Sequence, residues 1–410
     1  MGGERKASLL SSCYSSTNHN AMQIPFHKPF ITEDEIAEVV DSLRSGWITM
    51  GPKTGKFEEE FGEYIGAKHA VAVNSCTAAL HLALKAINLK AGDEVIVPTV
   101  TFTATAEVVC YFGAKPVIVD VEEGTQNIDS AAVERAITAR TKAIIPVHFG
   151  GQPCDMDEIL SLAERHKLYV IEDAAHAVPA WYGTRSGRVG RKIGTIGDMT
   201  CFSFYATKTL ATGEGGMVTT ENEEWAEKMR IMRLHGISKD AWKRYTGEGS
   251  WYYEVVDAGY KYNMTDIQAG LGRAQLRKVE RMWERRKTIA EKYSEAFSSL
   301  EEIETPIVKE DRETSWHLYV IQLKREALTI ERSRFMDELR EKGITASVHF
   351  IPLHRHPFYR DTFGLTREDF PVAERYYERC VSLPLYVGMT DAESDYVIDT
   401  VIDTVKRSRR

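Results

Sequence analysis

Short apolar runs alternate with longer amphipathic segments through the first two thirds of the chain. The runs are rich in Val and Ile, which is typical of buried strands, and they cover 69–73, 94–97, 116–119, 141–146 and 168–171. Segments 78–90 and 130–139 lie between them and predict helices, and Asp155 is predicted to cap another helix. This alternation predicts an α/β fold with a mostly parallel central sheet and helices on both faces.

A helix is also predicted before the first strand. Thr32 and Glu35 have the spacing of a capping box, which marks the start of a helix. The residues that follow repeat at helical spacing and predict one apolar face, made of Ile36, Val39, Val40 and Leu43. We expect this face to pack against the rest of the protein.

From about residue 271 the pattern changes to long helices and isolated strands. The predicted elements are a charged helix, a strand, a helix and a strand, at 273–300, 316–323, 332–342 and 345–350. A last helix begins at a capping box formed by Thr390 and Glu393. We therefore predict a flexible N-terminal extension (1–22), a large α/β domain (23–270) and a small C-terminal α+β domain (271–410).

Composition narrows the class of protein. The chain has 410 residues, a net charge of −8 and 43% hydrophobic residues, so it is a globular protein and not a basic nucleic-acid binder. Its six cysteines form no Cys-x-x-Cys pair, which favours reduced thiols in a cytoplasmic protein. No apolar run is long enough to cross a membrane, and the first twenty residues lack the apolar core of a signal peptide.

One lysine stands out in a polar, glycine-rich turn. Lys208 lies between the predicted strands 200–204 and 218–220, and Gly213, Gly215 and Gly216 follow it. A lone lysine is usually a surface cation, but loops at strand ends of α/β sheets carry ligands. A lysine amine can form a Schiff base with the aldehyde of pyridoxal phosphate. A nucleotide-binding P-loop is excluded because its lysine follows its glycines.

Three other features could complete such a site. Ser75, Cys76 and Thr77 join a strand to a helix and could bind a phosphate, although Ser75 could equally be a plain N-cap. Asp173 ends an apolar strand and could pair with a protonated ring nitrogen, or Glu172 and Asp173 could be a surface acid pair. Phe102 also follows a strand end and could stack on a ring or belong to the core.

Other stretches leave two interpretations open. The loop 45–53 carries Trp47 and could contact a ligand or simply connect two helices. A basic segment with Lys239, Lys243 and Arg244 could meet a diphosphate or form a solvated helix face. Three histidines at 349, 354 and 356 are interrupted by prolines and Arg355, so we expect no metal site there and assign His349 to ligand contact.

Together these motifs resemble the DegT/DnrJ/EryC1/StrS family of sugar-nucleotide aminotransferases, which have the fold of type I pyridoxal-phosphate enzymes. The resemblance covers roughly residues 24–405, and its motifs are Asn74 to Leu80, Glu172 to His176, Ser203-Phe204 with Lys208, Thr212 to Gly216, and Gly259 to Ala269. Within the family the chain is most similar to enzymes that aminate C4 of a UDP-linked 4-keto sugar. Gly46 to Thr49, Thr141 to His148, His235-Gly236 with Asp240 to Trp242, and Gly259 to Asn263 carry that likeness.

The resemblance implies a role for each motif. Lys208 would hold pyridoxal 5'-phosphate, and Asp173 would contact its pyridine nitrogen. The residues near the ring would be His176 and Phe102, and those holding the phosphate would be Cys76, Thr77 and Ser203. Asn263 would reach the phosphate of the partner in a homodimer whose active site lies at the subunit interface, and Thr49 and His349 would lie near the sugar.

The expected activity is a ping-pong transamination from an amino acid, glutamate by family likeness, to a keto sugar nucleotide. Lys208 would then move the proton, and Asp173 would keep the ring protonated. Two alternatives stay open: a lyase or dehydratase acting on a similar sugar, and a non-catalytic sugar-nucleotide-binding regulator. The identities of the base and the sugar are not fixed by the sequence, since surface glycans, lipopolysaccharide and antibiotics all use such sugars.

Overall fold

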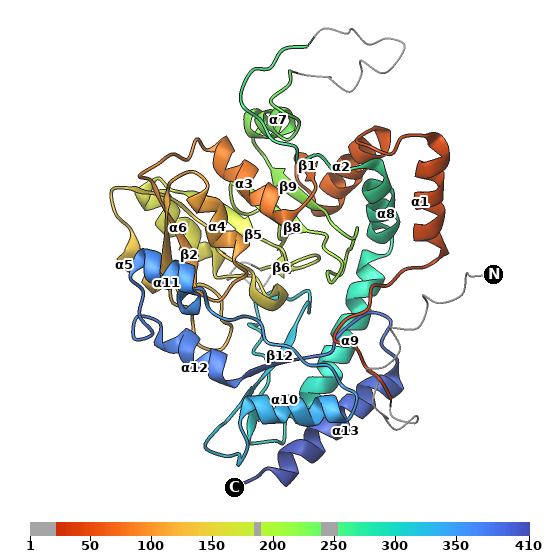
Figure 1. The fold of residues 1–410 in the computed structure, drawn as a ribbon, viewed down its shortest axis with the longest axis vertical. Coiled ribbons are helices and arrows are strands. Elements are labelled where there is room, and N and C mark those ends of the chain that lie inside the picture. The colour runs from red at the N-terminus through yellow and green to blue at the C-terminus, as the bar shows by residue number, and fades with distance from the viewer. Residues whose placement is uncertain (1–21, 184–189, 239–252) are drawn as a thin grey trace, which may run out of the picture.

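A seven-stranded sheet lies at the centre of the protein (Figure 1). It is seen in a computed structural model that describes residues 22–183, 190–238 and 253–410. The N-terminal extension up to residue 21, the basic segment 239–244 and the Asp240 to Trp242 motif therefore lie outside the described residues. No helix among the described residues is long and apolar enough to span a membrane.

The sheet has the order β1-β9-β8-β5-β4-β2-β3. Its strands are β1 (His69–Val73), β2 (Glu94–Pro98), β3 (Lys115–Val119), β4 (Thr141–Ile144), β5 (Tyr169–Asp173), β8 (Met199–Ser203) and β9 (Gly216–Thr220). β9 runs antiparallel to both of its neighbours, and the other pairs are parallel. The prediction of a mostly parallel sheet is confirmed.

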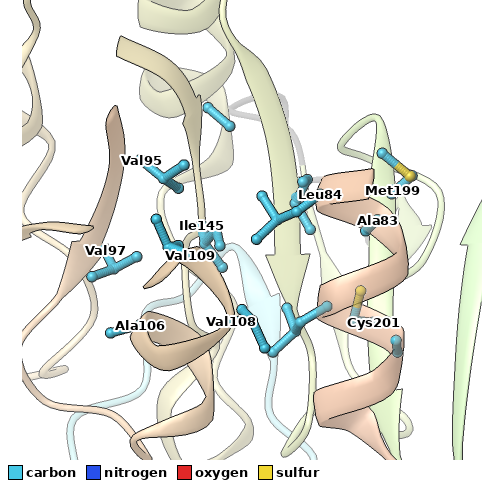
Figure 2. Close-up of a cluster of buried hydrophobic side chains, with 14 of the residues drawn as sticks. Ala83, Leu84, Val95, Val97, Ala106, Val108, Val109, Ile145, Met199 and Cys201 are labelled. Atoms are coloured by element: carbon cyan, nitrogen blue, oxygen red, sulfur yellow. The ribbon is translucent and has the colours of Figure 1, made fainter. Parts of the chain in front are cut away.

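Both faces of the sheet are covered, because alternate residues of each strand point to opposite sides. In β2, Val95 and Val97 belong to one apolar cluster, whereas Ile96 belongs to another. Figure 2 shows the first cluster, in which Leu84 and Val108 come from helices and Val95 and Ile145 from the sheet region. Helices on this side are α3 (Cys76–Ala86), α4 (Ala104–Cys110) and α7 (Glu223–Met232); on the other side lie α2 (Pro52–Ile65), α5 (Ser130–Ala136), α6 (Met156–His166) and α8 (Asp266–Leu276).

The C-terminal part has its own apolar cluster and a three-stranded antiparallel sheet. The sheet contains β10 (Ile303–Glu304), β12 (Tyr319–Leu323) and β13 (Cys380–Leu383). The helices are α9 (Val279–Phe297), α10 (Arg332–Glu341), α11 (Pro357–Phe363), α12 (Pro371–Arg379) and α13 (Asp391–Arg407). A second small sheet joins β6 (Trp181–Tyr182), β7 (Arg191–Lys192) and β11 (Arg312–Glu313).

The helix α9 connects the two parts of the molecule (Figure 1). Its start, at Val279 and Met282, packs with the large sheet, and its end, at Tyr293 and Phe297, packs with the C-terminal cluster. The division into a large domain at 23–270 and a small one at 271–410 stays a proposal.

The helix α1 (Glu33–Ser45) begins at the predicted capping box, but its expected orientation is wrong. Ile36 and Leu43 are 47% and 55% exposed, whereas Glu35 and Ser42 are buried. The reason is tertiary: Glu35 forms an ion pair with Lys278 (2.5 Å), and the Ser42 hydroxyl donates to the Asp266 carbonyl (3.1 Å). The polar side of α1 therefore faces the protein.

Three other predictions need correction. The helix predicted over 273–300 is two helices, α8 and α9, because the chain breaks at Lys278, whose ammonium binds Thr32 and Glu35. The strand predicted over 345–350 is irregular and pairs with β13 only through a bridge at Ser347. Asp155 precedes α6, but its carboxylate makes no cap bond and instead pairs with Lys309 and Arg312.

Candidate active site

Lys208 lies in the loop that joins β8 to β9. Backbone bonds close this loop: Phe204 donates to the Gly215 carbonyl (2.9 Å) and Thr212 donates to the Phe204 carbonyl (2.8 Å). The lysine side chain ends in the protein interior, where burial lowers the pKa of Lys208 to about 8. The nearby Cys76 and Asp173 oppose this fall in pKa. A lysine with this pKa is partly neutral near physiological pH and can act as a base.

Asp173 lies at the end of β5 and is buried. It accepts hydrogen bonds from the Thr105 hydroxyl (2.7 Å) and the Ala175 amide (3.1 Å). Burial raises the pKa of Asp173, while these bonds and the charge of Lys208 lower it, and the net shift is upward. The structure thus places the carboxylate and the lysine amine close enough for the charge of each to affect the pKa of the other.

The side chain of the neighbouring acid, Glu172, lies on the opposite face of the sheet. Successive strand residues alternate sides, so Glu172 points away from Asp173. Its carboxylate is fully buried and binds His148 (2.9 Å), the Gly197 amide (2.8 Å) and the Thr200 hydroxyl (2.7 Å). The two acids are therefore not a surface pair.

The start of α3 lies against the start of β9. Ser75 caps the helix by accepting from the Ala78 amide (3.1 Å), and the amides of Cys76 and Thr77 are those that a helix leaves without an intrahelical acceptor. A Cβ on Gly216 would stand 2.6 Å from the carbonyl of Ser75. Only glycine allows this approach, which places the helix start beside the turn that carries Lys208.

The remaining predicted cofactor residues lie around the same turn. Ser203 ends β8, and its hydroxyl accepts from the Tyr205 amide (3.3 Å). The Cys76 thiol contacts the carbonyl of Cys201 (3.6 Å), and burial, then Asp173, raises the pKa of Cys76. Phe102 is 61% exposed, and its ring lies 6.3 Å from that of Phe350.

Three histidines lie near the lysine amine, of which His176 and His317 are buried and His349 is half-buried. His317 Nε2 lies 3.4 Å from Lys208 Nζ, and the rings of His317 and His176 are 4.3 Å apart. Burial and the charge of Lys208 hold the pKa of His176 and of His317 well below the ordinary value. The same two causes lower the pKa of His349 to about 4. These rings are neutral at physiological pH.

His349 was expected near a ligand, and it lies within the electrostatic influence of Lys208. Its Nδ1 contacts the Ser382 hydroxyl (2.9 Å), and its ring stacks on Phe26 at 5.3 Å. His354 instead binds Thr99 and Glu374, at 2.7 Å each. Among the described residues no group of His, Cys, Asp or Glu is arranged to hold a metal ion.

Thr49 and Asn263 are not brought to the lysine by any contact of the described residues. Thr49 is exposed, and its carbonyl accepts from the Asp266 amide (2.8 Å) at the start of α8. Asn263 forms a bridge with Val73 of its own chain, just before the capped helix start. Their roles stay predictions.

Sequence reasoning missed two residues that hold the site together. Thr105 was part of a Thr-rich stretch with no assigned role, yet its hydroxyl positions Asp173. His317 was placed inside a predicted strand, and nothing in its neighbours marked it; the strand begins only at Tyr319. Both depend on contacts between distant segments, which no local motif encodes.

The donor set fits pyridoxal phosphate, which needs an amine, a carboxylate for its ring nitrogen and a phosphate cradle. Lys208 supplies a buried amine, and α3 supplies a helix start at glycine-only distance. Within the described part of the chain, the hydrogen-bond partners of the Asp173 carboxylate are the neutral Thr105 hydroxyl and Ala175 amide, so its charge is available to a cationic ring. Each requirement is met from a different element at one end of the sheet.

Comparison with known proteins agrees with the fit of the site to pyridoxal phosphate. Residues 29–402 match the model of the DegT/DnrJ/EryC1/StrS aminotransferase family. A protein of Methanocaldococcus jannaschii named "Uncharacterized protein MJ1066" is 58% identical over 384 residues, covering 94% of this chain and 97% of that one. The Bacillus subtilis spore coat polysaccharide biosynthesis protein SpsC is 52% identical over 384 residues, covering 93% and 97%.

The fold is also found in solved structures. The protein named "Putative sugar aminotransferase Spr1654" of Streptococcus pneumoniae, in its PLP form, superposes with a TM-score of 0.87 at 37% identity, covering 94% of this chain and 99% of that chain. The same protein has been solved in a PMP form, with the same TM-score.

Proposed function

The chain belongs to the DegT/DnrJ/EryC1/StrS aminotransferase family, and from that premise we propose that it transfers an amino group from glutamate to the C4 keto group of a UDP-linked sugar. The resemblance seen in the sequence, the type I fold and the pyridoxal phosphate cofactor are confirmed. The protein is a pyridoxal-phosphate-dependent sugar aminotransferase. The identity of the nucleotide, the sugar carbon that is aminated and the amino donor belong to the proposal.

One observation supports the proposal: the lysine amine and the buried carboxylate of Asp173 lie at one end of the sheet, close enough for each charge to affect the pKa of the other group. When bound, pyridoxal phosphate supplies an aldehyde for covalent attachment and a ring that withdraws electrons. Lys208 is the residue for that attachment. With a pKa of about 8, its Nζ, once free, accepts a proton from one carbon and returns it to another. Asp173 Oδ holds the proton on the ring nitrogen.

The phosphate is assigned to the start of α3. The amides of Cys76 and Thr77 and the hydroxyls of Thr77 and Ser203 are the donors, and the partial positive charge of the helix start supports them. Burial raises the pKa of the Cys76 thiol, so Cys76 binds through its amide and not as a thiolate. Phe102 covers the open face of the ring with its exposed side, and His176 lies beside it.

Two further residues are assigned to the sugar. His349 is neutral, because burial lowers its pKa to about 4, so it can donate or accept a hydrogen bond with a hydroxyl. Thr49 offers an exposed hydroxyl from the loop that precedes α2. A role in carbohydrate biosynthesis agrees with the spore coat polysaccharide protein that is 52% identical to this chain.

A homodimer is part of the proposal. α1 turns its polar side inward and leaves Ile36 and Leu43 exposed, an arrangement that a second copy would explain. Tyr205, three residues before Lys208, is also 47% exposed. A partner lying over these residues would bring its Asn263 and Thr49 to the site. Mixing Lys208→Ala with Asn263→Ala subunits tests this, because activity recovered on mixing requires a shared site.

The decisive assay is a substrate panel. UDP-, GDP- and dTDP-linked keto sugars are incubated with glutamate and the loaded enzyme, and products are identified by mass. We expect an amino sugar and 2-oxoglutarate from the UDP-linked 4-keto sugar. Loss of water or release of ammonia without consumption of the donor would favour the lyase or dehydratase alternative. An amino sugar formed only from another nucleotide would overturn the substrate assignment and leave the transamination intact.

A further inference from the structure

One histidine that the proposed function does not use contacts the central lysine. His317 Nε2 lies 3.4 Å from Lys208 Nζ, and within the described residues it is the one hydrogen-bond partner of that amine. The His317 side chain is buried, and its Nδ1 finds no partner in the described part of the chain. A buried ring nitrogen without a partner destabilises a fold, so a plain packing role would be better filled by an apolar residue.

The state of the lysine fixes the direction of the hydrogen bond. A lysine ammonium can only donate, so Nε2 of His317 accepts and the proton of the ring lies on Nδ1. The ring can accept because it is neutral: burial and then the charge of Lys208 hold the pKa of His317 well below its ordinary value. The contact therefore favours the charged form of the amine.

The backbone that carries the imidazole is fixed from two directions. Arg286 of α9 donates from Nε to the carbonyl of Trp316 (2.9 Å) and from Nη2 to the carbonyl of His317 (2.7 Å). On the other side, the Ser315 hydroxyl donates to the carbonyl of His176 and accepts from the amide of His317 (3.2 Å). These bonds hold the backbone of His317 at a set place relative to the loop after β5, and the ring lies between Lys208 Nζ (3.4 Å) and the ring of His176 (4.3 Å).

We propose that His317 is a positioning residue that holds the free amine of Lys208 in place and sets how readily it takes up a proton. The inference rests on the proposed role of Lys208 as the proton carrier. Other ionisable groups also act on this amine or lie near it, namely Cys76, Asp173, Arg286, His27, His176 and His349. His317 differs from them in making a direct hydrogen bond.

The test measures the amine itself in the cofactor-free protein. Trace labelling with acetic anhydride across a pH range, followed by mass analysis of the peptide containing Lys208, gives the midpoint of its titration. We expect a wild-type midpoint of about 8. His317→Leu removes the acceptor, and the midpoint should fall by about one unit or more, as expected for a lost hydrogen bond to a charged group. His317→Gln keeps an acceptor of similar reach and should stay near the wild-type midpoint.

A matched control is His81→Leu. His81 is also buried, and its Nδ1 contacts the Tyr262 hydroxyl (2.9 Å), but it makes no contact with Lys208 in the described residues. It should leave the Lys208 midpoint unchanged. If His317→Leu does not fold, His317→Asn takes its place, because its shorter amide cannot reach the amine and the same fall is expected.

Kinetics of the loaded enzyme add a second readout. In His317→Leu and His317→Asn, the acidic limb of the pH profile of kcat should move to lower pH, while KM for the amino donor stays unchanged. A Lys208 titration midpoint and an acidic limb of kcat that both match the wild-type values would overturn the inference. In that case a Lys208→Ala variant without turnover would still leave the proposed function standing, whereas Lys208→Ala with normal turnover would remove the proposed function itself.

Discussion

Replacing Thr105 with valine removes the hydrogen bond that holds the buried Asp173 carboxylate. The Thr105 hydroxyl donates to Asp173 Oδ2 at 2.7 Å and in turn contacts the Thr101 hydroxyl at 2.7 Å. Hydrogen bonds to charged groups contribute about 1.5 to 3 kcal/mol. We therefore expect Thr105→Val to destabilise the cofactor-free protein by about 2 kcal/mol at neutral pH and to raise the pKa of Asp173 by about one to two units.

The raised pKa of Asp173 determines how the free energy of unfolding changes with pH. Burial already raises the pKa of Asp173 above its unfolded value, so stability falls as pH rises from the unfolded pKa through the folded pKa. Thr105→Val raises the folded pKa further, so its extra cost grows as pH rises from the folded pKa of the wild type to that of the variant, and it is full above the latter. At a pH below the raised folded pKa, the carboxyl of Asp173 is already neutral in the folded protein, so the variant loses only a bond to a neutral carboxyl, worth about 1 kcal/mol.

Urea unfolding of the cofactor-free variant at about pH 4 and about pH 8 measures this difference. The matched control is Thr219→Val, because the buried Thr219 hydroxyl donates to a neutral acceptor, the Gly194 carbonyl, at 2.8 Å. The control should cost about 1 kcal/mol at both pH values. An equal cost for Thr105→Val at both pH values, or one no larger than that of the control, would refute the reasoning. Cofactor affinity should fall in Thr105→Val and stay unchanged in the control.

The other predictions concern the helix start, a buried ion pair and the exposed face of α1. Gly216→Ala places a Cβ 2.6 Å from backbone, so we expect a loss of at least about 2 kcal/mol in urea unfolding and weaker cofactor binding. Gly55→Ala meets nothing within 4 Å and lies inside α2, so it should not destabilise the protein and should add up to about 1 kcal/mol through helix propensity. Lys278→Met leaves the buried Glu35 unpaired and should cost about 3 kcal/mol. Hydrogen bonds outweigh burial and lower the pKa of Glu35, so this cost should shrink as pH falls through the folded pKa. Leu43→Asp should shift the protein from dimer to monomer in light scattering, and an unchanged dimer would contradict the proposed interface.

The elements and the centre of the site could be predicted because their signals are local. The apolar run before Asp173 is a strand buried on both faces, and such runs stand out in any sequence. The turn around Lys208 was marked by its glycines, and Gly216 proves to be required by the close approach of Ser75. Each of these signals lies within a few residues of the residue that it marks.

Features that depend on distant partners could not be predicted. The apolar pattern of α1 suggested that Ile36 faces the protein. Glu35 does so instead, because it forms an ion pair with Lys278 at the break between α8 and α9. The same contact interrupts the long helix that the charge pattern favoured. His317 comes to Lys208 only when the C-terminal part packs on the sheet.

The central claim is that Lys208 carries the cofactor covalently, and one measurement tests it directly. The enzyme loaded with pyridoxal phosphate is reduced with borohydride, digested and analysed by mass. We predict that the cofactor mass appears on the peptide containing Lys208, and that Lys208→Ala, although folded, carries no such label and has no turnover. A label on another lysine, or normal turnover in Lys208→Ala, would contradict the account.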